Sequence, residues 1–135
     1  MGGNGTFAAG KIAAYRWETV GKIGNVKILE PILPEGQKRV SHKLPEESHS
    51  SRMYILQYGD GNFAQLRIYD SFHRLRFELG YHREPRLDNT GRSVLHYHTY
   101  VYHRGQSLFD RSEAKPVTEK MWRRFKQYMK GVEHK

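Results

Sequence analysis

The sequence predicts an α+β domain in which an antiparallel sheet of four to six strands carries a C-terminal helix packed on one face. Two patterns lead to this prediction. Residues 48–103 contain alternating apolar and polar runs separated by short turn sequences, which is typical of a strand meander. In residues 117–132 the apolar residues instead recur at helical spacing. The chain has 135 residues and no cysteine, so we expect a single domain at residues 15–135 without disulfides, after a glycine-rich arm at residues 1–14.

Each strand is justified by its composition and by the turn residues that bound it. Residues 15–20 and 26–30 are β-favouring runs around a glycine-rich turn and are expected to form a hairpin. Residues 35–51 are polar and rich in turn formers, so a loop is expected there. The strands of the meander are then expected at residues 53–58, 63–69, 74–81 and 94–103.

The C-terminal helix is predicted from an apolar stripe and from the residues at its two ends. Thr118 has the side chain of a preferred N-cap, and Gly131 stands where a helix would end. Such a stripe more often packs on a sheet than binds a partner, so we expect it to cover one sheet face. The stripe consists of Val117, Met121, Trp122, Phe125, Met129 and Val132.

The charge balance points to an anionic partner. The chain has 23 basic and 14 acidic residues, a formal net charge of +9 with histidine neutral. A surplus of this size attracts phosphate backbones and other anionic surfaces, and the attraction should weaken with salt. No apolar run reaches the length of a membrane span, so no membrane partner is expected and the cytoplasm is the default location.

Strand parity predicts what the uncovered face of the sheet presents. His96, His98 and Tyr100 share one side of the last strand. The opposite parity, which includes Ala64 and Leu75, is apolar and is expected to pack under the helix. The other face should be open and polar, and its predicted residues are Gln65, Arg67, Tyr69, Arg76, Glu78, His82, His96 and His98.

A resemblance to a known family extends over most of the chain up to about residue 102. It is carried by the segments MGGNGTFA, LPEESHSS, YILQYGDGNFAQLRIYDSFHRLRFELGYHREP and VLHYH. These segments resemble phage-encoded domains that occur alone or fused to the C-termini of phage head-morphogenesis (minor capsid) proteins. The spacing also resembles polymorphic toxin domains that are grouped with metal-independent ribonucleases of the barnase, EndoU, colicin and RelE type.

The resemblance implies site residues, partners and a location. It implies RNA as substrate, a phage capsid protein or an immunity protein as partner, and a place in the host cytoplasm or the virion. It makes no statement about oligomeric state. The residues it marks are His49, Arg67, Tyr69, Asp70, His82, His96 and His98.

The first functional hypothesis is a metal-independent ribonuclease that needs no cofactor. Two histidines would move protons between the ribose 2′-OH and the leaving 5′-oxygen, with His82 and His98 preferred and His96 next. Arg67 or Arg76 would stabilise the charged phosphorane. The residues assigned to catalysis are His82, His96, His98, Arg67 and Tyr69, and those assigned to substrate binding are His49, Arg76, Gln65 and Glu78.

Two other hypotheses stay open at this point. Because H-x-H on a strand puts two imidazoles on one face, His82, His96 and His98 could bind a metal ion, with Glu78 or Glu84 as a further ligand. Alternatively, the domain is a non-catalytic phage module that binds nucleic acid or protein through stacking and phosphate contacts. The residues for that role are Tyr97, Tyr100, Tyr102, His103 and Arg104.

Overall fold

The structure of the protein is a computed structural model and describes residues 16–32, 44–49, 51–102 and 109–133. The glycine-rich arm predicted at residues 1–14 lies outside the described residues. The strands are β1 (Arg16–Ile23), β2 (Val26–Ile32), β3 (Met53–Gln57), β4 (Phe63–Tyr69), β5 (Leu75–Arg83), β6 (Ser93–Tyr102), β7 (Phe109–Arg111) and β8 (Lys115–Pro116). They are followed by the helix α1 (Glu119–Phe125) and a 3-10 turn (Lys126–Tyr128).

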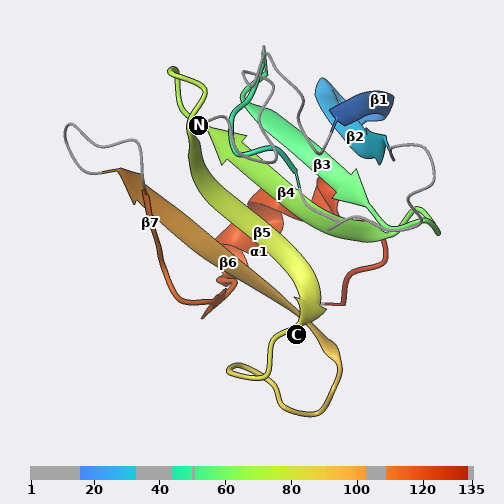
Figure 1. Ribbon diagram of the computed structural model, residues 1–135. Helices are drawn as coiled ribbons and strands as arrows, with labels where there is room; N and C mark the ends of the chain where they lie inside the picture. Colours follow the sequence, from blue (N-terminus) through green and yellow to red (C-terminus); the bar gives the residue numbers. More distant parts are fainter. Residues whose placement is uncertain (1–15, 33–43, 50, 103–108, 134–135) are drawn as a thin grey trace.

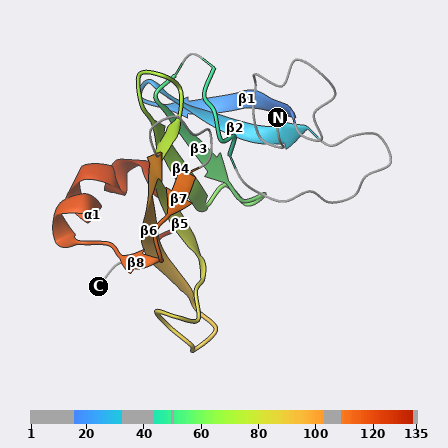
Figure 2. The same ribbon diagram turned by 60° about the vertical axis from the view of Figure 1, so that its left-hand side comes forward.

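The strands form one mixed sheet with α1 against one face. Its order is β1-β2-β3-β4-β5-β6-β7, and β8 pairs with β6. Figure 1 shows the central strands in front of α1, and Figure 2 shows α1 to one side of the twisted sheet, in which β1 and β2 run across the direction of β6. In the described part of the chain, no helix is long and apolar enough to cross a membrane.

The predicted sheet had too few strands, and its strands were wrongly expected to be antiparallel throughout. The described residues contain eight strands, not four to six, because β7 and β8 have only three and two residues and are too short to show alternation. The pair β2–β3 is parallel, whereas a fully antiparallel sheet was expected. The connection from Ile32 to Met53 is long enough for a crossover, and a parallel pair requires such a connection.

The local predictions of hairpin and meander are confirmed. β1 and β2 pair antiparallel around Gly24 and Asn25, and Gly24 has the positive φ of 60° that such a tight turn requires. The strands β3 to β6 follow one another as antiparallel neighbours, with bounds within about two residues of those predicted.

The helix begins where predicted and is shorter than its apolar stripe. The Thr118 side chain accepts a hydrogen bond from the Met121 backbone N–H at 3.2 Å, as an N-cap does. α1 ends at Phe125, but after the 3-10 turn Met129 is again buried at 4% exposure. Gly131 follows with φ of 80°. The stripe therefore packs as one surface although only its first half is α-helical.

The face under α1 contains the first apolar core. The ring of Phe77 stacks on Tyr97 and on Phe125, with centroids 5.7 and 5.8 Å apart. Strand side chains complete this core, and its buried members are Ile28, Ile55, Phe63, Leu66, Leu79, Leu95, Val117, Phe125 and Met129. The predicted packing of the helix on one face of the sheet is confirmed.

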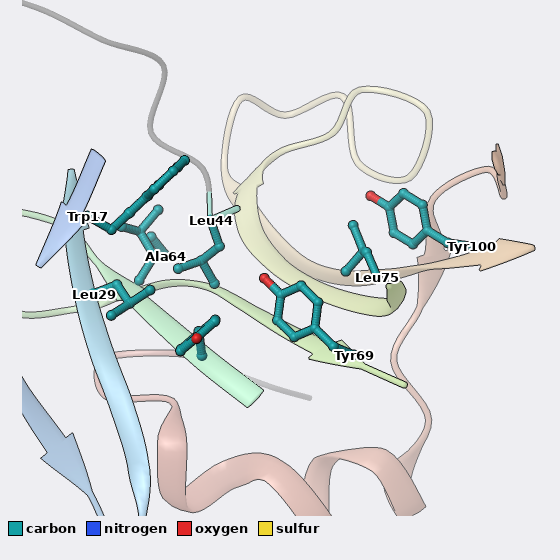
Figure 3. Packing of buried hydrophobic residues seen from close by; sticks show 9 residues of the cluster. Trp17, Leu29, Leu44, Ala64, Tyr69, Leu75 and Tyr100 are labelled. Carbon is teal, nitrogen blue, oxygen red and sulfur yellow. The ribbon is translucent and has the colours of Figure 1, made fainter. Parts of the chain in front are cut away.

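The opposite face was predicted to be open and is instead largely covered. It has its own buried cluster, consisting of Trp17, Leu29, Leu44, Tyr54, Leu56, Ala64, Tyr69, Leu75 and Tyr100. Figure 3 shows these side chains on the side of the strands away from the helix. The predicted open face was wrong because a segment remote in sequence, residues 44–48, lies across it.

Two predicted parities were also wrong, for Ala64 and Leu75. The register of β3 with β4 and of β4 with β5 shifts once each, which inserts Ala64 and Arg76 as extra residues. The extra residue of a β-bulge interrupts strict alternation, so that side chains on its two sides no longer share the parity expected from their spacing. Ala64 and Leu75 therefore belong to the second core and do not pack under the helix.

Candidate functional site

A short segment, residues 44–48, covers the centre of the second face, and we call it the covering segment. Leu44 is 0% exposed within the second core. At the far end the Ser48 N–H donates to the His73 carbonyl at 3.0 Å, and the Ser48 hydroxyl lies 3.0 Å from His73 Nδ1. The segment is therefore tied to the sheet at both ends.

Side chains of β4 hold the covering segment by its backbone. The Leu44 N–H donates to Gln65 Oε1 at 2.7 Å, and Arg67 Nη1 donates to the Leu44 carbonyl at 2.8 Å. The Tyr69 hydroxyl donates to the Pro45 carbonyl. Because the covering segment has no sheet partner for these groups, the β4 side chains satisfy backbone polar groups that would otherwise be buried alone.

Beneath the covering segment lies a buried ionic network of Arg67, Glu78 and Tyr100. Glu78 Oε1 accepts hydrogen bonds from Arg67 Nε and Nη2 at 3.1 and 3.0 Å and from the Tyr100 hydroxyl. Arg67 and Glu78 are 6% and 2% exposed. Burial alone would raise the pKa of Glu78, but Arg67 and the Tyr100 hydrogen bond bring it below its ordinary value, so this carboxylate is charged.

Several residues that were predicted to contact substrate are instead buried in this network or bonded to the covering segment. Burial raises the pKa of Tyr69 and of Tyr100 well above the ordinary value, so both hydroxyls remain donors. Arg67 and Tyr69 are buried and bonded to the covering segment or to Glu78. As the structure stands, these side chains position other groups and do not face solvent.

Beside this network three imidazoles lie in contact, and we call them the histidine row. The ring centroids of His82 and His96 are 4.5 Å apart and those of His96 and His98 are 5.3 Å apart, with each pair nearly perpendicular. In the pairing of β5 with β6, His96 stands opposite Gly80 and His98 opposite Glu78. The structure thus brings together the three histidines that the sequence singled out.

The backbone determines the tautomer of each ring in the row. The Nδ1 atoms of His82, His96 and His98 lie 2.8, 2.8 and 2.9 Å from the carbonyl oxygens of Arg83, Val94 and Ser112. A carbonyl oxygen only accepts hydrogen bonds, so each Nδ1 carries the hydrogen. In each neutral ring Nε2 is then the nitrogen with the free lone pair.

The three rings differ in burial. His82 is exposed, His98 is 5% exposed and His96 is 0% exposed. Nε2 of His96 is buried without a hydrogen-bond partner, and it is the one such side-chain atom among the described residues. Burial, and then the neighbouring His82 and His98, lower the pKa of His96 despite the opposing effect of its hydrogen bond to Val94, so this ring is neutral near pH 7.

Gly80 is a part of the site to which the sequence reasoning assigned no role. A Cβ at this position would lie 3.3 Å from Nε2 of His96 and 3.4 Å from Nε2 of His82. The absent side chain leaves a gap that both nitrogens face. An isolated glycine inside an alternating strand signals such a close approach and could have indicated it.

Arg111 is the second residue that the sequence did not indicate. Its side chain is 49% exposed, and Nη2 lies 3.6 Å from Glu78 Oε2. In the pairing of β6 with β7 it stands opposite Tyr100, and the next residue, Ser112, accepts the His98 hydrogen bond. Because β7 could not be predicted, no sequence signal connected this arginine to the histidines.

Two of the predicted substrate-binding residues lie away from the row. The backbone N–H of His49 donates a hydrogen bond at 3.2 Å to the hydroxyl of Tyr54 on β3, which lies two strands away from β5. Arg76 lies 3.8 Å from Asp70 and over the ring of Tyr102 at 6.0 Å. The structure therefore does not bring His49 and Arg76 to the histidines.

Arg76 belongs instead to an exposed cluster of arginines and aromatic rings at the other end of β5. The guanidinium of Arg74 lies 5.3 Å from the ring centroid of Phe72 and 5.0 Å from that of Tyr102. Phe72 is 74% exposed. We call Phe72, Arg74, Arg76 and Tyr102 the aromatic–arginine cluster.

The tyrosines predicted for a binding surface are divided between environments. Tyr97 packs under the helix, Tyr100 belongs to the buried network, and Tyr102 is part of the aromatic–arginine cluster. His103 and Arg104 lie outside the described residues.

The predicted three-histidine metal site is not formed as expected. Over the described ranges, no group of three or more histidine, aspartate or glutamate side chains is arranged to hold one ion. Glu78, one of the two carboxylates expected as a further ligand, is directed into the network with Arg67 and Tyr100. Glu84, the other, belongs to no group of three potential ligands among the described residues.

Comparisons of the chain with protein-family models, with curated proteins and with solved structures find no significant match. The resemblance to phage-encoded and toxin-nuclease domains therefore stays a prediction.

Proposed function

We propose that the protein is a small, toxin-like, metal-independent ribonuclease whose acid–base groups are His82, His96 and His98. The observation that carries the proposal is the histidine row, in which a backbone carbonyl accepts a hydrogen bond from every Nδ1. In the proposed reaction Nε2 is therefore the nitrogen of each ring that exchanges protons. Imidazoles have pKa values near neutrality, which suits both the removal and the return of a proton at physiological pH.

The proposed reaction is an internal transfer at phosphorus. One Nε2 takes the proton of a ribose 2′-OH, and the 2′-oxygen forms a bond to phosphorus. The bond from phosphorus to the 5′-oxygen breaks as a second imidazolium gives that oxygen its proton. The products are a 2′,3′-cyclic phosphate and a free 5′-OH. His82 is the exposed ring of the row and is the one we expect to contact RNA.

In this proposal Arg111 replaces Arg67 and Arg76 as the cation for the phosphate. It is half exposed and next to Ser112, whose carbonyl holds His98. A guanidinium offers paired donors to phosphate oxygens and stabilises the charge of the phosphorane. The net charge of +9 supports attraction of an RNA backbone.

The test is incubation of the pure protein with end-labelled RNA, with and without EDTA. We expect cleavage that survives EDTA and leaves cyclic phosphate ends. His82→Ala should lower the rate by about 10²–10⁴-fold, as loss of an acid–base group does. The matched control is His73→Asn, because His73 is also exposed and has φ of 66°, a conformation that asparagine tolerates.

Three results would contradict the proposal. They are the absence of cleavage of any RNA, cleavage that EDTA abolishes, and full activity retained in both His82→Ala and His98→Ala. The last result would have to be read on folded protein, which circular dichroism of each variant establishes.

A second candidate function, RNA binding without cleavage, is favoured by the aromatic–arginine cluster. Exposed aromatic rings stack on bases, and the adjacent arginines pair with phosphates. Phe72→Ala should then weaken binding of single-stranded RNA by about 1–3 kcal/mol in a filter-binding or anisotropy assay. Under this function His82→Ala changes affinity little, whereas an unchanged affinity of Phe72→Ala would contradict it.

A further inference from the structure

Two ring nitrogens lie close to the space that a side chain at residue 80 would occupy, and we call this space the gap beside Gly80. Nε2 of His96 and Nε2 of His82 lie 3.3 and 3.4 Å from the position that a Cβ of residue 80 would take. The His96 nitrogen is buried and has no hydrogen-bond partner. A buried polar atom without a hydrogen-bond partner is rare in proteins, and one explanation is that the atom binds a water molecule or an ion.

The donor set selects the kind of ligand. Each ring donates its Nδ1 hydrogen to a backbone carbonyl, the outer-shell arrangement that orients a metal-binding histidine. Two neutral imidazoles suit Zn²⁺, Ni²⁺ and Cu²⁺, whereas Mg²⁺ and Ca²⁺ require oxygen ligands.

We propose that His82 and His96 form a two-histidine Zn²⁺ site in the gap beside Gly80. The site differs from the three-histidine site predicted from the sequence, because among the described side chains no three potential ligands are arranged to hold one ion. Zn²⁺ is ordinarily four-coordinate, so the remaining positions are open to water or to a phosphate oxygen.

Occupation of this site has a consequence for catalysis that rests on the proposed function. A Zn²⁺ ion bound to both Nε2 atoms holds the lone pairs that would accept a proton. Zn²⁺ should therefore inhibit RNA cleavage, and EDTA should restore it.

The test uses the free protein and ZnCl₂, followed by long-range ¹H–¹⁵N NMR spectra of the histidine rings. We expect one ion per chain to shift Nε2 of His82 and His96 while each Nδ1 keeps its hydrogen. MgCl₂ should produce no shift. A shift centred on other histidines, or no shift, would overturn the proposal.

Three variants make the test specific. His82→Ala removes an exposed ligand and should weaken Zn²⁺ binding by at least about tenfold. Gly80→Ala keeps both ligands but fills the gap between them, so it should also weaken binding. The control His73→Asn should bind as the native protein does. Binding that is equal in all three variants and the native protein would contradict the site.

The outcome for Zn²⁺ and the outcome for RNA are separable. Zn²⁺ binding without any RNA cleavage would contradict the ribonuclease and leave the metal site supported. RNA cleavage without Zn²⁺ binding would contradict the metal site and leave the ribonuclease supported.

Discussion

The buried network and the histidine row are neighbours on one face of the sheet, but they differ in how far the hydrogen bonds of their polar atoms are satisfied. In the network, Glu78 accepts from Arg67 and Tyr100, and Arg67 also bonds the covering segment. In the row, the rings of His82 and His96 contact each other, yet Nε2 of His96 bonds to nothing.

The difference shows that buried polar side chains can serve two roles, to stabilise the fold or to bind a proton or ligand. A fully partnered network stabilises one arrangement of the chain, since removing either partner leaves a charge buried alone. An unpartnered nitrogen beside an exposed ring makes no stabilising hydrogen bond and keeps a lone pair that can bind a proton or an ion. From this contrast we expect network variants to affect stability and row variants to affect function.

The largest expected effect is at the ion pair of the network. Arg67→Met removes the buried cation that is bonded to Glu78 and leaves the half-exposed Arg111, at 3.6 Å, as the remaining ionic partner. It should cost about 3–5 kcal/mol of unfolding free energy, measured by urea denaturation. Adding Glu78→Leu should recover part of the loss. As a control, Arg123→Met breaks the exposed pair with Glu119, whose atoms are 3.6 Å apart, and should cost no more than about 1 kcal/mol. Equal costs for Arg67→Met and Arg123→Met would refute the structural role of the network.

A smaller effect is expected at the hydroxyl of Tyr100. Tyr100→Phe removes one donor to Glu78 and should lower the unfolding free energy by about 1–3 kcal/mol without slowing RNA cleavage. The comparison variant is Tyr58→Phe, whose hydroxyl makes an exposed bond to the Tyr81 carbonyl at 2.7 Å and should matter less. Loss of cleavage in a folded Tyr100→Phe protein would show that the network takes part in chemistry.

The reverse pattern is expected for His82. Its ring is exposed, so His82→Ala should change the unfolding free energy by no more than about 0.5 kcal/mol. The same variant should lose RNA cleavage. A large loss of stability would place His82 with the structural residues and remove the distinction between the two regions.

The smallest effect concerns pH. The pKa of His96 in the folded protein lies below the ordinary value of 6.5, so the unfolded chain binds more protons as the pH falls through that value. The neutral His96 ring leaves the unfolding free energy at its full value above pH 6.5. That free energy is lost in part as the pH falls from 6.5 through the pKa that His96 has in the folded protein. His96→Leu should therefore show a smaller decline in urea stability between about pH 7.5 and 5 than the native protein. Identical declines would contradict the neutral, buried state of this ring.

The sequence alone determined the local features. Alternation is a property of consecutive residues, so the strands β3 to β6 and the common face of His96, His98 and Tyr100 followed from it. The Thr118 cap and the Gly24–Asn25 turn followed from the chemistry of single side chains and of glycine.

Tertiary structure decided everything that depends on segments distant in the chain. The bulges at Ala64 and Arg76 arise from pairing with a neighbouring strand, and β7 exists only where β6 offers an edge. The covering segment turned a predicted open face into a second core, because it found backbone partners on Gln65 and Arg67. Burial and hydrogen bonding depend on which atoms meet in space, so the sequence could name the three histidines but only the fold could show which nitrogen of each is free.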